Sequence, residues 1–200
     1  FINSLSGLPP NPQDTADLVS LKSKNNEFKY KPGLVMVGSH VKLATDQLEV
    51  LLKDKSCEGL EIPVSKLADI FTLEDSQQEI LEMEDILLSK INDILDIKKI
   101  PVLYTSREEM KFSSYSKRMN FGLELAEFMA ILVRKITNKL GYIISKGGIT
   151  TQLLLQKGLN FKQVDLKGQI LPGLSIVTSN SDQYDLPVVT FPGNLGDEKT

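Results

Sequence analysis

The sequence is poor in the residues that most often carry metal or redox chemistry. Its 200 residues include one cysteine, Cys57, one histidine, His40, and no tryptophan. A single cysteine cannot close a disulfide within the chain, and it excludes a cysteine cluster around zinc. We expect no Cys–His catalytic pair and no metal held by the chain's own side chains. Because disulfides belong to oxidising compartments, their absence favours a cytoplasmic protein.

Long apolar runs and an excess of basic residues are lacking too. No stretch reaches the roughly 18 apolar residues of a membrane-spanning helix, and the first residues lack the basic start and apolar core of a signal peptide. Lysine and arginine number 23 against 26 acidic residues, a net charge of -3, whereas nucleic-acid modules are usually basic. We therefore expect neither a membrane nor a nucleic acid as partner. A nucleotide remains compatible with this charge, because backbone N–H groups hold phosphate without net positive charge.

Two parts of the chain differ in composition and in hydrophobic periodicity. Residues 1–31 contain three prolines close together and a polar run, without hydrophobic periodicity, and we predict a linker or arm there. Residues 32–200 carry alternating apolar and polar segments and are predicted to form one domain with its own core.

Short apolar runs alternate with amphipathic segments and predict an α/β fold, a mainly parallel sheet flanked by helices. Thr45 is expected to cap the first of the helices. After Gly158 the pattern changes to β-structure, with turns at Gly168 and at Pro172-Gly173, which we expect to add antiparallel strands at one edge of the sheet. Strands are predicted at 34–38, 60–65, 100–106 and 141–145, and helices at 45–53, 75–95, 118–140 and 151–157.

Three glycine motifs follow predicted strands: VGSH at 37–40, KGGIT at 146–150 and FPGNLG at 191–196. In open α/β sheets, ligands bind outside the carboxyl ends of the strands. Turns built from small residues on that edge allow the backbone to approach a ligand closely. The three motifs together predict a crevice at the carboxyl edge.

Each motif has a structural alternative to ligand binding. Gly147-Gly148 and Thr150 indicate either a phosphate cradle or a strand-to-helix turn in which Thr150 or Thr151 is a plain N-cap. Ser39 either donates to a phosphate or caps a turn. FPGNLG is either a turn that contacts a nucleotide or a surface turn with Asn194 in the left-handed region.

Two charged groups near these motifs also have two interpretations. Arg107 follows the predicted strand at 100–106 and either reaches an anion or pairs on the surface with Glu108 or Glu109, which we prefer. The acidic segment with Glu79, Glu82, Glu84 and Asp85 is expected to be a solvated helix face rather than a metal site.

Five segments, in order, resemble the C-terminal domain of the four-carbon acid sugar kinase family, once known as a domain of unknown function. They are LVMVGSHVKLATDQLEVLL, VLYTSRE, YIISKGGITTQLLLQKGL, VDLKGQILPGLS and LPVVTFPGNLGD, spanning about residues 34 to 197. The resemblance implies ATP contacts at Ser39, at Gly147, Gly148, Ile149 and Thr150, and at Gly193, with Asn194 and Gly196 extending that last turn. Ile149 stands where bacterial members often have a polar residue.

The resemblance further implies a two-domain kinase that uses ATP, with Mg²⁺ accompanying the nucleotide. The acid sugar, such as a tetronate, binds an N-terminal domain with a DD-x-TG motif, which this sequence lacks. We therefore expect these 200 residues alone to be inactive, and the catalytic residues stay unknown. The alternative is a non-catalytic nucleotide-binding module with a regulatory or structural role. Self-association into a homo-oligomer stays open.

Overall fold

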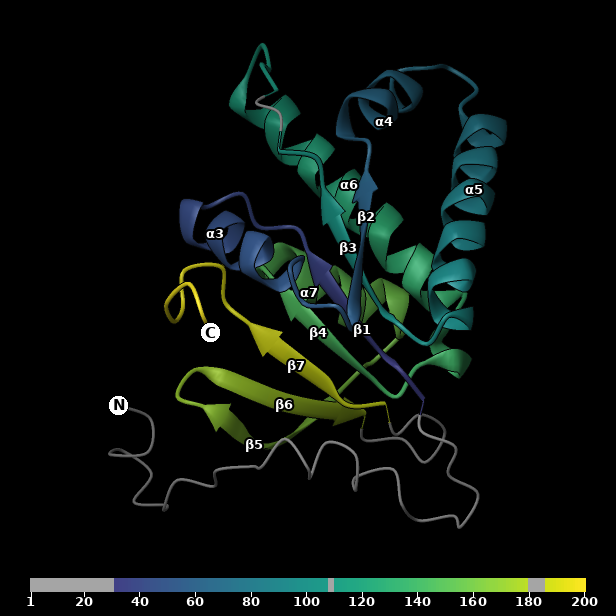
Figure 1. Ribbon diagram of the computed structural model, residues 1–200. Coiled ribbons are helices and arrows are strands. Elements are labelled where there is room, and N and C mark those ends of the chain that lie inside the picture. The colour runs from purple at the N-terminus through teal and green to yellow at the C-terminus, as the bar shows by residue number, and fades with distance from the viewer. Residues whose placement is uncertain (1–30, 108–109, 180–185) are drawn as a thin grey trace.

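A computed structural model describes residues 31–107, 110–179 and 186–200 of the chain (Figure 1). The arm predicted for residues 1–31 lies almost wholly outside these ranges and stays a prediction. The described residues form an α/β fold around one seven-stranded sheet, so the predicted fold class is confirmed.

The sheet has the strand order β2-β3-β1-β4-β7-β6-β5. The first five strands in this order run parallel, while β6 is antiparallel to β7 and β5 is antiparallel to β6. The antiparallel strands predicted for one edge are therefore present. The bounds are β1 Gly33–Val37, β2 Cys57–Ile62, β3 Ile100–Thr105, β4 Tyr142–Lys146, β5 Val164–Leu171, β6 Leu174–Ser179 and β7 Val188–Phe191.

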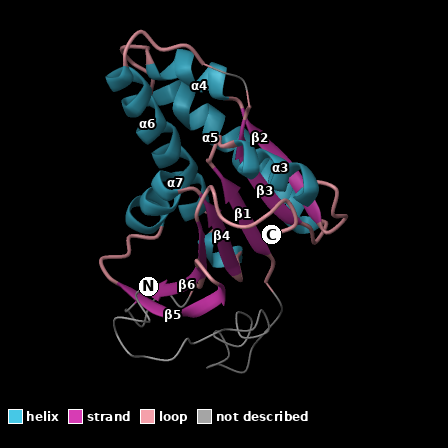
Figure 2. Cartoon of the chain, turned by 90° about the vertical axis from the view of Figure 1, so that its left-hand side faces the viewer, coloured by secondary structure: helices cyan, strands magenta, loops and turns pink. Residues whose placement is uncertain are grey.

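Helices cover both faces of the sheet. Figure 2 shows α3 and the C-terminal segment on one side and α6 and α7 on the other. The helices are α3 Lys42–Leu51, α4 Val64–Phe71, α5 Gln77–Asp96, α6 Tyr115–Arg134 and α7 Gly148–Leu153, with a 3-10 turn at Thr137–Lys139 and a π-helical turn at Leu154–Gly158.

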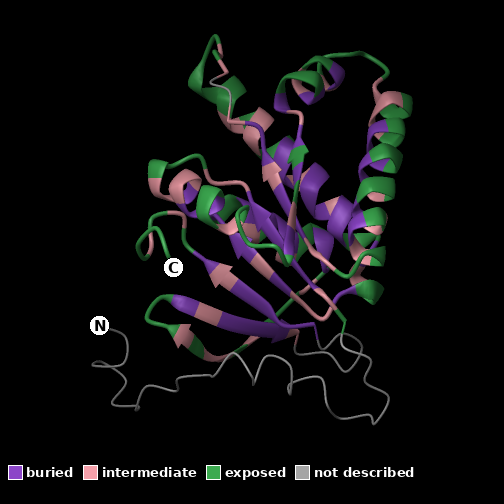
Figure 3. Cartoon of the chain, in the orientation of Figure 1, coloured by how far each residue is buried: buried purple, intermediate pink, exposed green. Residues whose placement is uncertain are grey.

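The core follows from the alternation of side chains along β1. Leu34 and Met36 pack in the large cluster with α4, α5 and α6, whereas Val35 and Val37 face Leu48 of α3. Successive side chains of a strand point to opposite faces, so a strand buried on both faces is apolar throughout. Figure 3 shows this burial concentrated in the central strands and in the helix faces turned toward them.

Several predicted boundaries are wrong for local reasons. Helix α3 begins at Lys42 after Val41, so Thr45 lies inside the helix and is not its N-cap. The strand predicted at 60–65 is β2 and ends at Ile62. Pro63 stands at the N-cap of α4, an eight-residue helix that we did not predict. Its apolar start, Val64, directly continues the apolar run of β2, which explains the error.

Two further expectations are corrected. Gly168 lies within β5, at a shift in the β5–β6 register, and forms no turn, whereas Pro172-Gly173 does. In α5, Glu84 is buried and forms an ion pair with Lys135, so this part of the acidic segment is not a solvated face.

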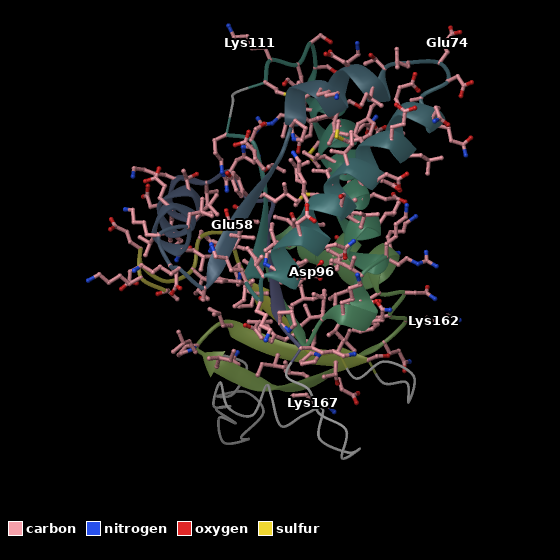
Figure 4. The ribbon with its side chains drawn as sticks, turned by 45° about the vertical axis from the view of Figure 1, so that its right-hand side comes forward. Glu58, Glu74, Asp96, Lys111, Lys162 and Lys167 are labelled. Atoms are coloured by element: carbon pink, nitrogen blue, oxygen red, sulfur yellow. The ribbon has the colours of Figure 1, made fainter. Side chains whose placement is uncertain are left out.

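Charged side chains mark both edge strands of the sheet. Glu58 of β2 pairs with Lys99, and Lys167 of β5 pairs with Asp165; Figure 4 shows Glu58 and Lys167 at these two edges. Charges on edge strands discourage pairing with other chains. Among the described helices, none is both long and apolar enough to cross a membrane.

Candidate functional site

The three glycine motifs meet at one edge of the sheet. They follow β1, β4 and β7, which are neighbours in the strand order and run parallel, so their carboxyl ends lie side by side. Backbone hydrogen bonds extend this pairing into the turns. The N–H of Gly38 donates to the carbonyl of Lys146 at 3.2 Å, and that of Gly147 donates to Phe191 at 2.9 Å.

The turns pack so closely that side chains would collide at two glycines. A Cβ added at Gly38 would lie 2.0 Å from Thr150 Oγ1, and one at Gly193 would lie 2.4 Å from Ser39 Oγ. Gly147, with a φ of 118°, adopts a conformation that residues with a side chain rarely reach. We call Gly38, Ser39, Gly147, Thr150 and Gly193 the glycine cradle.

The start of α7 forms the open side of this cradle. Within the described residues, no hydrogen bond involves the N–H groups of Gly148, Ile149 or Thr150. These are the first amides of a helix, which lack acceptors in the preceding turn. Gly148 and Ile149 are exposed, and a Cβ at Gly148 would meet nothing within 4 Å. Packing therefore does not require glycine at position 148.

The motif is a strand-to-helix turn between β4 and α7, but neither Thr150 nor Thr151 caps the helix, so the N-cap in the structural alternative is wrong. The N-cap is Gly147, without a side-chain bond. The hydroxyl of Thr151 donates to the carbonyl of Ser145 at 3.1 Å, below the turn. Thr150 is buried, and its hydroxyl lies against Gly38 and Gly147 inside the glycine cradle.

The last motif divides between the cradle and the C-terminal segment. Only Gly193 lies against Ser39. Asn194 is exposed and has no positive φ; the left-handed residue of this turn is Gly196, with a φ of 82°, so the conformation predicted for Asn194 is wrong. A Cβ at Gly196 would collide with Thr200, which places Gly196 in the tail and outside the cradle.

Gln47 of α3 holds this C-terminal segment. Its side-chain amide donates to the carbonyl of Leu195 at 3.1 Å and to that of Asp197 at 2.6 Å. Gln47 is buried, and its own Oε1 has no partner among the described residues. The end of the chain is thereby fixed across α3.

Lys146 is a residue of this site that our sequence reasoning missed. Its side chain is only 4% exposed. The ammonium donates to the carbonyl of Pro192 at 3.1 Å and lies 3.5 Å from the centre of the Phe191 ring. Within the described part of the chain it has no ion-pair partner, and burial lowers its pKa to about 8. Because side chains alternate along β4, Lys146 lies on the same face as the apolar Ile144. This spacing could have predicted from the sequence that Lys146 is buried.

On the other side of Ser39 lie Arg107 and His40. Arg107 Nη1 donates to the carbonyl of Ser39 at 2.5 Å. The acidic partners that we preferred for it, Glu108 and Glu109, lie outside the described residues. His40 Nε2 is 2.8 Å from Thr105 Oγ1. Burial, and then the charges of Arg107 and Arg118, lower the pKa of His40.

A family model described as a nucleotide-binding C-terminal domain matches residues 34–200. The match covers all three turns of the site. The chain belongs to this family. A nucleotide ligand is therefore a property of the family to which these residues belong. In the described ranges, no group of three or more acidic, cysteine or histidine side chains is arranged to hold a metal.

Solved structures share the fold at low identity. A domain of unknown function from Bordetella bronchiseptica, crystallised with citrate as a domain-swapped dimer, is 16% identical with a TM-score of 0.64; the alignment covers 84% of this chain and 39% of that one. A Haemophilus influenzae protein assigned to the same domain of unknown function is 19% identical, TM-score 0.59, covering 89% and 40%. A Salmonella typhimurium protein, provisionally named a tRNA synthase, is 16% identical, TM-score 0.56, covering 86% and 39%.

This chain thus spans about two fifths of the length of the solved structures that it matches. A search of curated proteins finds no match.

Proposed function

We propose that this chain is the ATP-binding domain of a kinase that phosphorylates a four-carbon acid sugar. The observation that carries the proposal is the convergence of three glycine turns, from distant parts of the sequence, at the carboxyl edge of neighbouring parallel strands. This is where α/β sheets bind ligands. The family's nucleotide ligand and the resemblance of five segments to acid sugar kinases support the same function.

The residues present fit a chain of phosphates. The amides at the start of α7 have no acceptor among the described residues, and Gly148 and Ile149 are exposed, so these amides can donate to phosphate oxygens; the positive end of a helix favours an anion there. Ser39 and Thr150 add hydroxyl donors, and Gly193 allows the turn to lie close to them. ATP would supply the phosphoryl group, and Mg²⁺ would be bound mainly by its phosphate oxygens.

The acceptor half of the reaction requires further protein. Phosphoryl transfer depends on placing the acceptor hydroxyl, the metal and the phosphate together, and the resemblance assigns sugar binding to an N-terminal domain. We therefore expect nucleotide binding, and no phosphorylation of tetronates, from these 200 residues alone. A parent protein that binds ATP but contains no sugar-binding domain would favour the non-catalytic module instead.

Gly148 offers a sharp test, because the fold tolerates a side chain there while a phosphate at the α7 amides would not. We expect ATP and ADP, but not NAD, to raise the melting temperature of the wild type by mass action. Calorimetric titration should show nucleotide binding lost in Gly148→Val. The matched control is Gly122→Val, because Gly122 lies within α6 and its Cβ also meets nothing. Stabilisation by NAD alone, or unchanged ATP affinity in Gly148→Val, would contradict the proposal.

A further inference from the structure

Arg107 has hydrogen-bond donors that no other residue in the described part of the chain accepts from. The side chain leaves the end of β3 and bonds the carbonyl of Ser39 through Nη1 alone. Its Nε and Nη2 are both shielded from solvent and have no partner among the described residues, which exclude Glu108 and Glu109. These two nitrogens form one edge of the planar guanidinium, the edge that binds two oxygens of a carboxylate or phosphate at once.

Such an arrangement is costly without a ligand. A buried donor that loses water and gains no partner costs about 1–3 kcal/mol, and more for a charged group. Among the described residues, Arg107 forms no ion pair; Glu61 and Tyr104 act on it only as nearby charges, and burial lowers its pKa. An oxyanion on this edge would remove the penalty.

We propose that the Nε–Nη2 edge of Arg107 is an oxyanion-binding subsite on the β3 side of Ser39, separate from the glycine cradle on the β4 side. Arg107 as a whole is only partly buried, so its guanidinium lies close to the surface of the protein. The bond from Nη1 to Ser39 ties the subsite to the residue that the cradle and the guanidinium share.

The neighbouring charges favour an anion. Burial lowers the pKa of His40, and the positive charges of Arg107 and Arg118 lower it further, so both arginines act on the same imidazole. Glu61 is the opposing charge that acts on Arg107 itself. An anion bound by Arg107 would offset its effect on His40 and raise the pKa of the imidazole.

The oxyanion has two sources, and here the inference rests on the proposed function. It is either the terminal phosphate of ATP, reaching past Ser39 from the cradle, or the anionic group of the acceptor. If the oxyanion is the terminal phosphate, Arg107 contributes to the binding of ATP but not to that of ADP. If the oxyanion belongs to the acceptor, Arg107 contributes to the binding of a tetronate, or of inorganic phosphate, in the presence of ADP.

The test compares Arg107→Gln and Arg107→Lys with the wild-type chain. The lysine variant keeps the charge and removes the two-nitrogen edge, and it serves if the glutamine variant does not fold. Arg118→Gln is the control, since it removes an equal charge near His40 from an exposed position. Calorimetry with ATP, ADP, inorganic phosphate and a tetronate is combined with NMR titration of His40, the single histidine of the chain.

We expect both Arg107 variants to bind one oxyanion at least about tenfold more weakly, the scale of hydrogen bonds to a charged group. A loss confined to ATP identifies the terminal phosphate, and a loss confined to phosphate or tetronate identifies the acceptor. In the wild type, that ligand should raise the pKa of His40, and in Arg107→Gln it should not.

Unchanged binding of all four ligands in the Arg107 variants would overturn the subsite. So would a wild-type chain that binds neither inorganic phosphate nor tetronate and shows no difference between ATP and ADP. Absence of ADP binding in the wild type would instead contradict the proposed function, and the phosphate titration would then decide on Arg107 by itself.

Discussion

Lys146 and Arg107 are two cations on opposite sides of Ser39, and they differ in burial and in how many of their donors are bonded. Each extends from the end of a strand beside β1 and donates to a backbone carbonyl of a turn at the site. Lys146 is almost fully buried, and its ammonium lies between the Pro192 carbonyl and the Phe191 ring. Arg107 is partly buried, and two of its nitrogens have no partner within the described ranges.

The difference separates a positioning role from a binding role. Lys146 is covered by the turn that it contacts, and we infer that it positions this turn through the Pro192 carbonyl and the Phe191 ring. Arg107 donates from Nη1 to the carbonyl of Ser39, and the planar edge formed by its Nε and Nη2 remains available for a ligand. A buried charge therefore need not be a ligand contact. Hydrogen-bond donors without a partner indicate a binding site better than the charge alone does.

The largest loss of stability is expected from disturbing the close contact between the β1 turn and α7, which lies between the two cations. In Gly38→Ala the new Cβ would overlap the hydroxyl of Thr150 and force β1 and α7 apart. Overpacking of this kind typically costs about 1–3 kcal/mol, and we expect a loss near the upper end, measured as the urea midpoint of unfolding. Gly148→Ala, which meets nothing, is the control. Removing the hydroxyl with Thr150→Ala should recover part of the loss, and equal midpoints for Gly38→Ala and wild type would refute the close packing.

A pH series sharpens the difference between the two cations. Folding lowers the pKa of Lys146 from 10.5 to about 8. Between these values the unfolded chain binds more protons, so stability contributed by this group rises with pH, at up to about 1.4 kcal/mol per unit. Lys146→Met should abolish this rise. Since burial raises the pKa values of Tyr104 and Tyr142, which act in the opposite direction, the difference between the two proteins is the measurement.

Urea melts of wild type and Lys146→Met at pH 7, 8, 9 and 10 give that difference. A constant gap across the series would mean that Lys146 titrates in the folded chain as it does in the unfolded one, and that burial does not perturb it.

The smallest effect is expected at Gln47, which supports the same turn from α3. Gln47→Leu loses two hydrogen bonds to the carbonyls of Leu195 and Asp197, each worth about 1 kcal/mol, and removes the unpartnered Oε1, which offsets part of the loss. We expect a net change of about 1 kcal/mol or less in unfolding free energy. Amide hydrogen exchange should accelerate in residues 192–200 while β1 stays protected. Unaltered exchange there would show that Lys146 alone holds the segment.

The sequence allowed the alternation of strands and helices to be predicted, because apolar runs and amphipathic spacing are local. It also placed the three glycine turns on one edge, because carboxyl ends of parallel strands share an edge. Contacts between distant residues were out of reach. For Thr150 the spacing left both an N-cap and a phosphate contact open, and it could not show that Thr150 lies against Gly38, more than a hundred residues away. Arg107 looked like a surface arginine for the same reason.

Among the described strands, β7 comes last in the sequence, yet it lies between β4 and β6 inside the sheet. A growing chain on the ribosome therefore has every other strand available before the one that joins the two halves. Until Val188–Phe191 is made, β4 and β6 each present an unpaired edge, and unpaired edges invite association with other chains. We would expect chains that stop short of residue 188 to aggregate rather than to fold as a smaller sheet.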